Sequence, residues 1–237
     1  MLIAPWWPCC EPCRHMEAEG NPESSCADAL LTALHECLHD LFIAPSCPIC
    51  RREGQIHEPT QPCHLCCEAL GLSAEGIRGL TPVRYRAAGL YRGKLRCLIL
   101  RQRVQPNPSV LKAITFALRR SLPANALLVP IPSWKRKRRA NPLPDLVCQS
   151  LQRSRRGLLK RCRPTVGQHR LSRNQRRLNM RSCFAIHPEA RLHSVIDSPI
   201  WIVDDILTTG ATAQEAFDPL RREGLDVRGL LCLGRTL

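Results

Sequence analysis

The segment 200–222 constrains the fold of this chain more than any other part of the sequence. It begins with the apolar run Ile200-Trp201-Ile202-Val203, continues with Asp204 and Asp205, and passes through Thr208-Thr209-Gly210-Ala211-Thr212 into a stretch with helical spacing. The short apolar run predicts a buried strand, and the glycine after two threonines predicts a tight turn at the start of a helix. A strand that leads directly into a helix is typical of a parallel α/β sheet.

The same turn has the composition of a phosphate-binding loop. The first turn of a helix offers unpaired amides and the positive end of a dipole, Gly210 permits close approach of the backbone, and the threonine hydroxyls add donors. The carboxylates of Asp204 and Asp205 could accept hydrogen bonds from ribose hydroxyls or help to hold a magnesium ion. The alternative is structural: the threonines cap the helix and the aspartates face water.

The rest of the C-terminal part alternates in the same way. Apolar runs predict strands at 83–91, 126–131, 158–162, 198–203 and 227–233, and helical spacing predicts helices at 94–104, 109–122, 143–154 and 213–222. Strands separated by helices imply an α/β fold with a mainly parallel sheet and helices on both faces. In such sheets ligands bind beyond the carboxyl ends of the strands.

Cysteine spacing sets the N-terminal part of the chain apart. Ten of the 15 cysteines lie before residue 68. Cys47 and Cys50 form one C-x2-C pair, and Cys63 and Cys66 form a second pair after twelve intervening residues, which is the spacing of a zinc ribbon. Two tight turns brought together would present four thiolates to a structural zinc ion. A chance cluster of thiols, or a relic that no longer binds metal, is the alternative.

The spacing recurs 37 residues earlier, so the cysteine-rich region is an internal repeat. Cys10, Cys13 and Cys26 match the first three ligands, and Ala29 stands where the fourth cysteine is expected. A second zinc is therefore an open alternative, with Asp28, His35 or Cys37 as candidates for the missing ligand; otherwise this ribbon is degenerate. A helix at 29–42 is expected to connect the two repeats.

Charge divides the chain near the same place. Residues 1–70 hold 3 Arg and no Lys against 10 acidic residues, net −7, and the remainder is net +22, within a total of +15. We therefore expect a cysteine-rich domain at 1–72 and an α/β domain at 73–237. The basic domain is suited to phosphate-rich ligands or nucleic acid. Its clusters at 135–139 and 170–181 could equally be solvated faces, and 4% aromatic residues leave few rings for stacking on bases.

The first residues have no basic start and no apolar stretch long enough for a signal peptide, and no apolar run approaches the length of a membrane span. We expect a cytoplasmic protein without a membrane span. In a reducing compartment, paired cysteines hold metal more often than they form disulfides.

The run 203–212 closely resembles the phosphoribosyl-pyrophosphate loop of type I phosphoribosyltransferases: a hydrophobic strand, two acidic residues and T-T-G-x-T. More of the chain resembles the ComF family, which is associated with natural competence. The shared features are the cysteine-rich front end, the segment 91–99, Val129-Pro130-Ile131-Pro132 followed by a basic cluster, and the stretch 168–181. Where that family has R-G-F-N-Q, this chain has Arg138-Arg139-Ala140-Asn141-Pro142, so only the asparagine is shared.

The resemblance implies a type I phosphoribosyltransferase-like fold behind a small zinc-ribbon region. It implies that the aspartates contact the ribose hydroxyls and that the turn binds the 5-phosphate. Lys135 and Arg136 would lie near the pyrophosphate, and the stretch with Arg173 and Arg177 would cover the site. The implied site residues are Asp204, Asp205, Thr208, Thr209, Gly210 and Thr212, with Lys135, Arg136, Arg173 and Arg177 as contacts to pyrophosphate or nucleic acid.

The implied activity is transfer of a phosphoribosyl group with release of pyrophosphate. Zinc as a structural metal and magnesium with phosphoribosyl pyrophosphate are the implied cofactors. Phosphoribosyl pyrophosphate or a related ribose phosphate, single-stranded DNA and a competence helicase are the implied partners. Because the sequence identifies no general base and no acceptor site, a non-catalytic protein that binds single-stranded DNA or docks a partner through the same fold is the alternative.

Overall fold

The computed structural model describes residues 46–53, 58–133, 140–163, 175, 180–188, 190, 194–195 and 197–237. The chain divides into two compact units, Met1–Ala44 and Pro45–Leu237, and the described residues all belong to the second. The expected boundary at residue 72 stays a prediction. The first cysteine repeat with Cys10, Cys13 and Cys26, the expected helix 29–42, and Lys135, Arg136, Arg173 and Arg177 lie outside the described residues.

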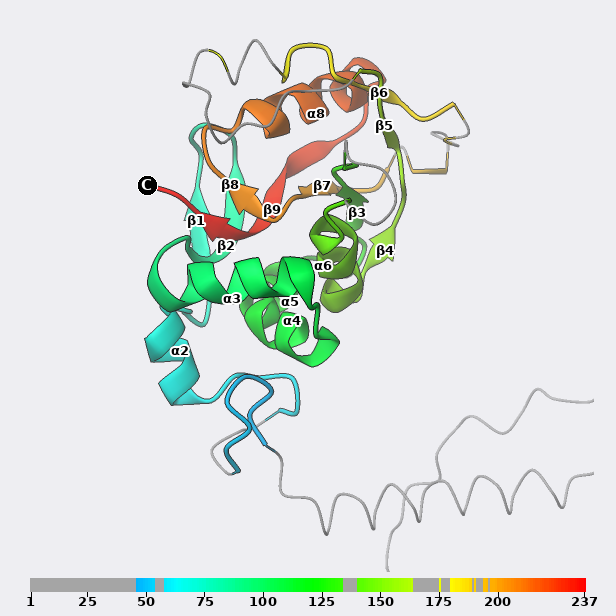
Figure 1. Ribbon diagram of the computed structural model, residues 1–237. Coiled ribbons are helices and arrows are strands. Elements are labelled where there is room, and N and C mark those ends of the chain that lie inside the picture. Colours follow the sequence, from blue (N-terminus) through cyan, green and yellow to red (C-terminus); the bar gives the residue numbers. More distant parts are fainter. Residues whose placement is uncertain are drawn as a thin grey trace, which may run out of the picture. The chain divides into compact units, whose positions relative to one another are not determined.

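A mainly parallel sheet forms the centre of the second unit, as the alternating pattern predicts (Figure 1). Within the described residues its strand order is β1 (Ile77–Gly79), β2 (Tyr85–Leu90), β9 (Val227–Arg235), β7 (Ile200–Val203), β3 (Leu127–Pro130) and β4 (Ser154–Arg155), with β8 (Ile206–Leu207) paired to β9. The β1–β2 pair is antiparallel and the other pairs are parallel.

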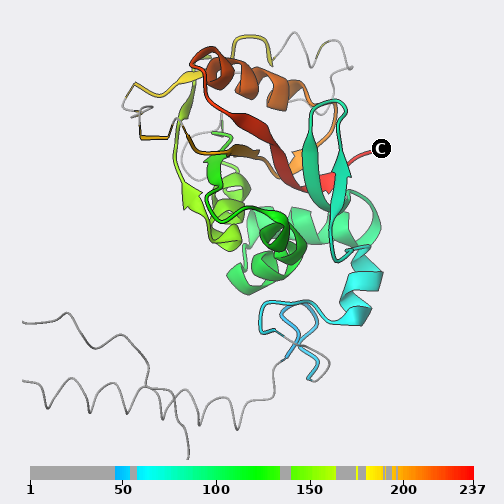
Figure 2. The same ribbon diagram turned by 180° about the vertical axis from the view of Figure 1, so that it is seen from behind.

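Helices cover both faces of this sheet, which confirms the predicted layering (Figures 1 and 2). One face carries α3 (Gly93–Val104), α4 (Pro108–Ile114), α5 (Phe116–Ser121) and α6 (Leu143–Leu151), and the other carries α8 (Ala211–Arg222). Strands β3 and β7 are buried along their whole length, as expected for strands covered on both sides. No helix in the described part of the chain is long and apolar enough to cross a membrane.

The predicted helix 109–122 is two helices, because Thr115 interrupts it. The Thr115 hydroxyl donates to the Leu111 carbonyl at 2.8 Å and lies 2.9 Å from the Ser150 hydroxyl. A threonine that bonds back to the preceding turn bends a helix. The predicted helix 143–154 ends earlier, at Leu151, because Gln152 adopts a left-handed conformation with φ 52°.

The apolar run at 158–162 forms a strand, but this strand lies outside the parallel sheet. It is β5 (Leu159–Arg161), which pairs antiparallel with β6 (Phe184–Ile186). Leu158, Leu159 and Phe184 pack into the same apolar cluster as α8. The small second sheet therefore helps to cover the α8 face of the main sheet.

Candidate functional site

The carboxyl ends of the parallel strands bring the aspartates and threonines of the predicted loop together. The chain leaves β7 through Asp204 and Asp205, forms β8, and enters α8 after Thr208, Thr209 and Gly210. Backbone hydrogen bonds tie the aspartates to β9: Asp204 N–H donates to the Leu231 carbonyl at 3.0 Å, and Leu233 N–H donates to the Asp205 carbonyl at 3.0 Å. These hydrogen bonds fix the backbone of Asp204 and Asp205, so both carboxyl groups lie at one edge of the sheet.

Asp205 is buried and paired. Asp205 is 4% exposed. One of its carboxylate oxygens, Oδ2, accepts hydrogen bonds from Arg103 Nε at 2.8 Å and Asn141 Nδ2 at 2.6 Å, and it forms an ion pair with Arg103 Nη2 at 2.6 Å. Charge-assisted hydrogen bonds of this kind fix a carboxylate in one orientation. The sequence did not identify Arg103, which stands 102 residues from its partner; Asn141 is the residue shared with R-G-F-N-Q.

Asp204 is half-buried, and its surroundings disfavour ionisation of its carboxyl group. Its Oδ1 accepts from the Asp205 amide at 2.9 Å. Burial, reinforced by the Asp205 carboxylate, raises the pKa of Asp204 to about 8, although Arg103 and Arg161 act in the opposite direction. Carboxyl groups with pKa values moved this far are concentrated at functional sites. Near neutral pH the protonated Asp204 carboxyl group can donate a hydrogen bond, and the Asp205 carboxylate beside it can accept one.

Replacing Asp204 with Asn is expected to stabilise the folded protein, and more so at alkaline than at acidic pH. The folded-state pKa of Asp204 lies above its unfolded value. The contribution of this carboxyl to stability is therefore complete below about pH 4 and is lost as the pH rises through about 8. Asparagine does not lose a proton, so we expect Asp204→Asn to raise the free energy of unfolding by at least about 1 kcal/mol at about pH 9.

Urea denaturation of the wild type and Asp204→Asn at acidic and alkaline pH measures this effect. Asp218→Asn, an exposed change on α8, is the matched control and should behave like the wild type at both values. If Asp204→Asn is less stable than the wild type at alkaline pH, the pKa of Asp204 in the folded protein is not raised.

The turn before α8 is tightly packed. Gly210 has φ 77°, and a Cβ atom built on it would overlap Pro82 Cγ and lie 2.9 Å from Pro82 Cβ. The Gly210 carbonyl accepts from the Gln214 amide at 2.9 Å, and Arg235 Nη1 donates to the Thr208 carbonyl at 2.6 Å. A backbone held from both sides in this way presents the first amides of α8 at a fixed place, which is the requirement for binding an anion there.

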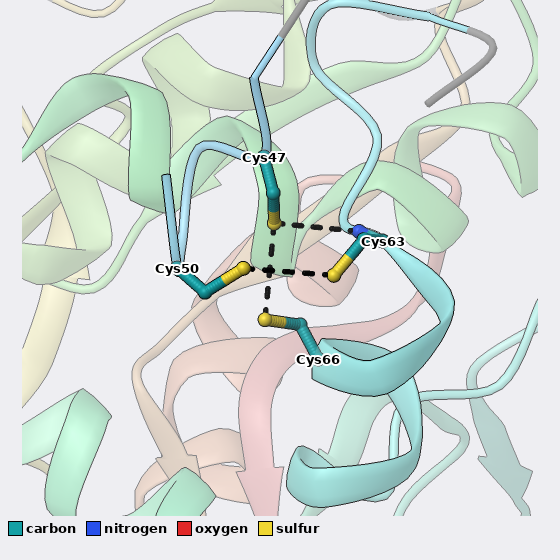
Figure 3. A group of neighbouring side chains, drawn as sticks. All are labelled: Cys47, Cys50, Cys63 and Cys66. Carbon is teal, nitrogen blue, oxygen red and sulfur yellow. Dashed lines mark hydrogen bonds between the residues drawn. The ribbon is translucent and has the colours of Figure 1, made fainter. Parts of the chain in front are cut away.

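The second candidate site is the cysteine cluster, in which four sulfur atoms point toward one another (Figure 3). Cys47 and Cys50 lie on a turn that is closed by the hydrogen bond from Arg51 N–H to the Cys47 carbonyl at 2.7 Å. Cys63 caps the N-terminus of α2 (His64–Leu70), and Cys66 lies in its first turn. The expectation of a tight turn thus holds for the first pair, whereas the second pair begins a helix.

The geometry of the cluster fits a tetrahedral metal. The four ligand atoms lie within 4.8 Å of one another, and the Sγ atoms of Cys47 and Cys66 are 3.8 Å apart, those of Cys50 and Cys63 3.7 Å. Zn–S bonds of about 2.3 Å give a tetrahedron whose edge is about 3.8 Å, whereas a disulfide requires about 2.05 Å. The four cysteines could therefore hold a metal ion without rearrangement.

The backbone around Cys47 also favours a thiolate. Burial alone would raise the pKa of Cys47, but the backbone N–H groups of Cys63, Cys50 and Ile49 outweigh it and lower that pKa to about 6. The Cys63 amide lies 3.4 Å from the Cys47 sulfur. The thiolate is the form that binds metal. Cys47 is therefore largely in its metal-binding form at neutral pH.

The cysteine segment is attached to the α/β fold by α5. Arg119 Nη2 lies 3.6 Å from Glu58 Oε2 and donates to the Thr60 hydroxyl at 3.1 Å. The segment from Ser46 to Leu70 and the parallel sheet belong to one compact unit. A change in the cysteine cluster can therefore act on α5 through these contacts.

The chain is similar to bacterial proteins that carry the name DNA utilization protein YhgH. The relative from Salmonella typhi is 36% identical over 124 residues, which are 49% of this chain and 52% of the relative. The relative from Escherichia coli strain K12 is 36% identical over 118 residues, 46% of this chain and 49% of the relative. The chain thus spans about half the length of the curated relatives it matches. No protein-family model matches the chain.

Proposed function

We propose that this chain is a ComF-type phosphoribosyltransferase-domain protein that binds phosphoribosyl pyrophosphate or a related ribose phosphate and acts in DNA uptake or use. One observation carries the proposal: two carboxyl groups and a Thr-Thr-Gly turn meet where a buried parallel strand leads into α8. Ligands bind to α/β sheets at this edge. The name DNA utilization protein, carried by relatives that are 36% identical, supports the biological half of the proposal.

In this proposal each side chain at the edge has a stated role. Asp204 and Asp205 accept hydrogen bonds from the ribose hydroxyls, and Arg103 and Asn141 position Asp205. Thr208, Thr209 and Thr212, with the backbone at Gly210, bind the 5-phosphate at the start of α8. Magnesium accompanies the pyrophosphate group, which Lys135, Arg136, Arg173 and Arg177 contact.

The reaction that such a site would support is displacement at C1 of the ribose. A nucleophile on the acceptor forms a bond to C1, the bond from C1 to the pyrophosphate oxygen breaks, and pyrophosphate leaves with the electron pair. A bound magnesium ion would supply positive charge to the leaving group, and the loop would hold the sugar for attack. Binding of the ribose phosphate is the core of the proposal, and transfer depends on an acceptor.

We further propose that Cys47, Cys50, Cys63 and Cys66 hold a structural zinc ion. The separations of the sulfur atoms match a tetrahedral site. The three buried cysteines, 0 to 8% exposed, form a small cluster of their own with Ile49 beside it. So small an apolar cluster contributes little stability by itself, which is the situation in which a metal takes over the role of a core.

Removing both carboxylates of the edge is expected to abolish binding of phosphoribosyl pyrophosphate. A hydrogen bond to the charged Asp205 contributes about 1.5–3 kcal/mol and one to the largely neutral Asp204 about 0.5–1.5 kcal/mol, so the double change Asp204→Asn/Asp205→Asn should weaken binding at least about 30-fold. Isothermal titration calorimetry with magnesium and phosphoribosyl pyrophosphate measures this. The control Asp218→Asn/Glu223→Gln removes two carboxyl groups from exposed positions on and just after α8 and should leave the affinity as it is.

The alternative function is binding of single-stranded DNA, with a competence helicase as partner and without catalysis. The net charge of +22 beyond residue 70 favours it, because basic surfaces bind phosphate backbones. If Asp204→Asn/Asp205→Asn binds phosphoribosyl pyrophosphate as tightly as the wild type does, the proposed ribose-phosphate site is wrong. DNA affinity that falls steeply with salt and weakens in Lys135→Ala/Arg136→Ala would then favour the alternative.

A further inference from the structure

A cavity lies at the edge of the sheet opposite to Asp204 and Asp205. Its volume is about 790 Å³, and it is lined by residues at the amino ends of β2, β7 and β9 and by the segment before β3. Because these strands run parallel, their amino ends share one edge and the carboxylate site occupies the other. The cavity and the carboxylate site are therefore separate places in the fold, and the proposed ribose-phosphate site does not use the cavity.

An uncompensated arginine lies in the wall of this cavity. Arg86 is half-buried; its guanidinium stacks over the Trp201 ring, 4.8 Å from the ring centroid, and donates to the Ser121 carbonyl. No carboxylate pairs with Arg86 within the described residues. Burial, together with the positive charges of Arg78 and Arg84, lowers the pKa of Arg86. A partly buried charge surrounded by like charges is costly unless an anion comes to it.

The indole beside this guanidinium also lacks a partner. Trp201 is 5% exposed and lines the cavity. Its Nε1 is the one buried side-chain nitrogen or oxygen atom, among the residues that the structure describes, with no hydrogen-bond partner. Buried N–H groups are nearly always paired, and an unpaired one destabilises a fold. Because this nitrogen has no accessible surface, a ligand in the cavity would meet the Trp201 ring and not its N–H.

Counting Glu75, which pairs with Arg78, the charged groups at the cavity sum to +1, so the cavity attracts anions. Four arginines line it, against Asp197 and Asp226. Arg228 is paired with Asp226 at 2.6 Å, and Arg78 with Glu75 at 2.7 Å. Arg84 and Arg86 have no acidic partner in the described part of the chain, and Asp197 is exposed. A phosphomonoester carries about −1.5 to −2 at neutral pH and offers several acceptor oxygens, and guanidinium groups match that geometry.

We propose that this amino-edge cavity is a second anion site, which binds the phosphomonoester of a nucleotide-sized ligand through Arg84 and Arg86, with the Trp201 ring holding the Arg86 guanidinium in place. The volume of about 790 Å³ lies within the range of about 300–1,000 Å³ that small-molecule sites occupy. The ligand chemistry has two sources, a free deoxynucleoside monophosphate or the 5′-phosphorylated end of a DNA strand. Both present one phosphomonoester on one nucleotide.

Titration with deoxyadenosine monophosphate, followed by calorimetry, tests the proposal. We expect Arg84→Ala, an exposed change, to weaken binding about tenfold through the loss of a charged contact. Arg222→Ala, which removes an exposed arginine from the far end of α8, is the matched control and should bind as the wild type does.

Three further results decide the outcome. Binding should survive Asp204→Asn/Asp205→Asn; if it disappears there, the ligand occupies the carboxylate edge and the proposal is wrong. Equal affinity of Arg84→Ala and the wild type, or inorganic phosphate binding as tightly as the nucleotide, also overturns it. The last measurement compares a 5′-phosphorylated oligonucleotide with the same oligonucleotide bearing a 5′-hydroxyl and with the free nucleotide. If the phosphorylated oligonucleotide binds more tightly than both, the strand end is the ligand. Otherwise the free nucleotide is the ligand.

Discussion

Replacing Cys50 with alanine is expected to remove one equivalent of zinc from each chain and to destabilise the protein strongly. Cys50 is exposed, so its side chain adds little apolar packing, and the effect of its loss reports on the metal. Structural zinc contributes apparent binding free energies of about 10–16 kcal/mol in small zinc domains. Because the cysteine segment is attached to a larger fold, we expect a smaller loss of stability here, of at least about 3 kcal/mol.

Zinc content by mass spectrometry of metals, together with thermal unfolding, measures both effects. The matched control is Cys97→Ala, which removes an exposed cysteine from α3, outside the cluster. The difference between the variants is the quantity that matters, because Cys10, Cys13 and Cys26 could bind metal of their own. Equal zinc content in Cys50→Ala and Cys97→Ala would contradict a metal site at the cluster.

A chelator should act on the wild type as Cys50→Ala does. The sulfur atoms of Cys47 and Cys66 are 3.8 Å apart and those of Cys50 and Cys63 are 3.7 Å apart. Without a metal ion between them, thiolates at these distances would repel one another. The turn at Cys47 then has only its backbone hydrogen bonds, and the apolar cluster with Ile49 remains small. The contacts of Glu58 and Thr60 with Arg119 are the ones we expect to weaken next.

Elements whose formation depends on their own sequence were predictable. The apolar runs at β3 and β7 are buried along their length, and α8 follows helical spacing closely. The C-x2-C pairs were predictable for a similar reason, because ligand spacing is local even though the metal joins distant residues. In each case the signal lies within a few residues of the structure that it specifies.

Features that depend on tertiary contacts were not predictable. Nothing local distinguishes Arg103 from Arg101, yet only Arg103 reaches Asp205. The strand β5 has the apolar pattern of a parallel strand and pairs antiparallel with β6 instead. The two-residue strands β4 and β8 are shorter than any periodic pattern that could reveal them. The uncompensated Arg86 appears only when three arginines, from β1, β2 and the segment just before it, meet at one cavity.

Replacing Gly210 with alanine is expected to destabilise the fold by about 2–4 kcal/mol, since a left-handed conformation and an overpacked site each add to the cost. Gly210 has φ 77°, and its Cβ would overlap Pro82. The turn can relieve this overlap only by moving away from Pro82, which moves the first amides of α8. We therefore expect phosphoribosyl pyrophosphate binding to fall sharply in the same variant.

Gly224→Ala is the matched control, because Gly224 has nearly the same conformation, φ 74°, with nothing within 4 Å of a built Cβ. It should lose only the conformational part, about 1 kcal/mol, and should bind ligand normally. The difference between the two variants in chemical denaturation measures the contact with Pro82, and the difference in calorimetry measures its effect on the loop. If Gly210→Ala folds like Gly224→Ala and still binds, the position of the turn is set by something other than Pro82, and the phosphate-binding role of α8 loses its structural support.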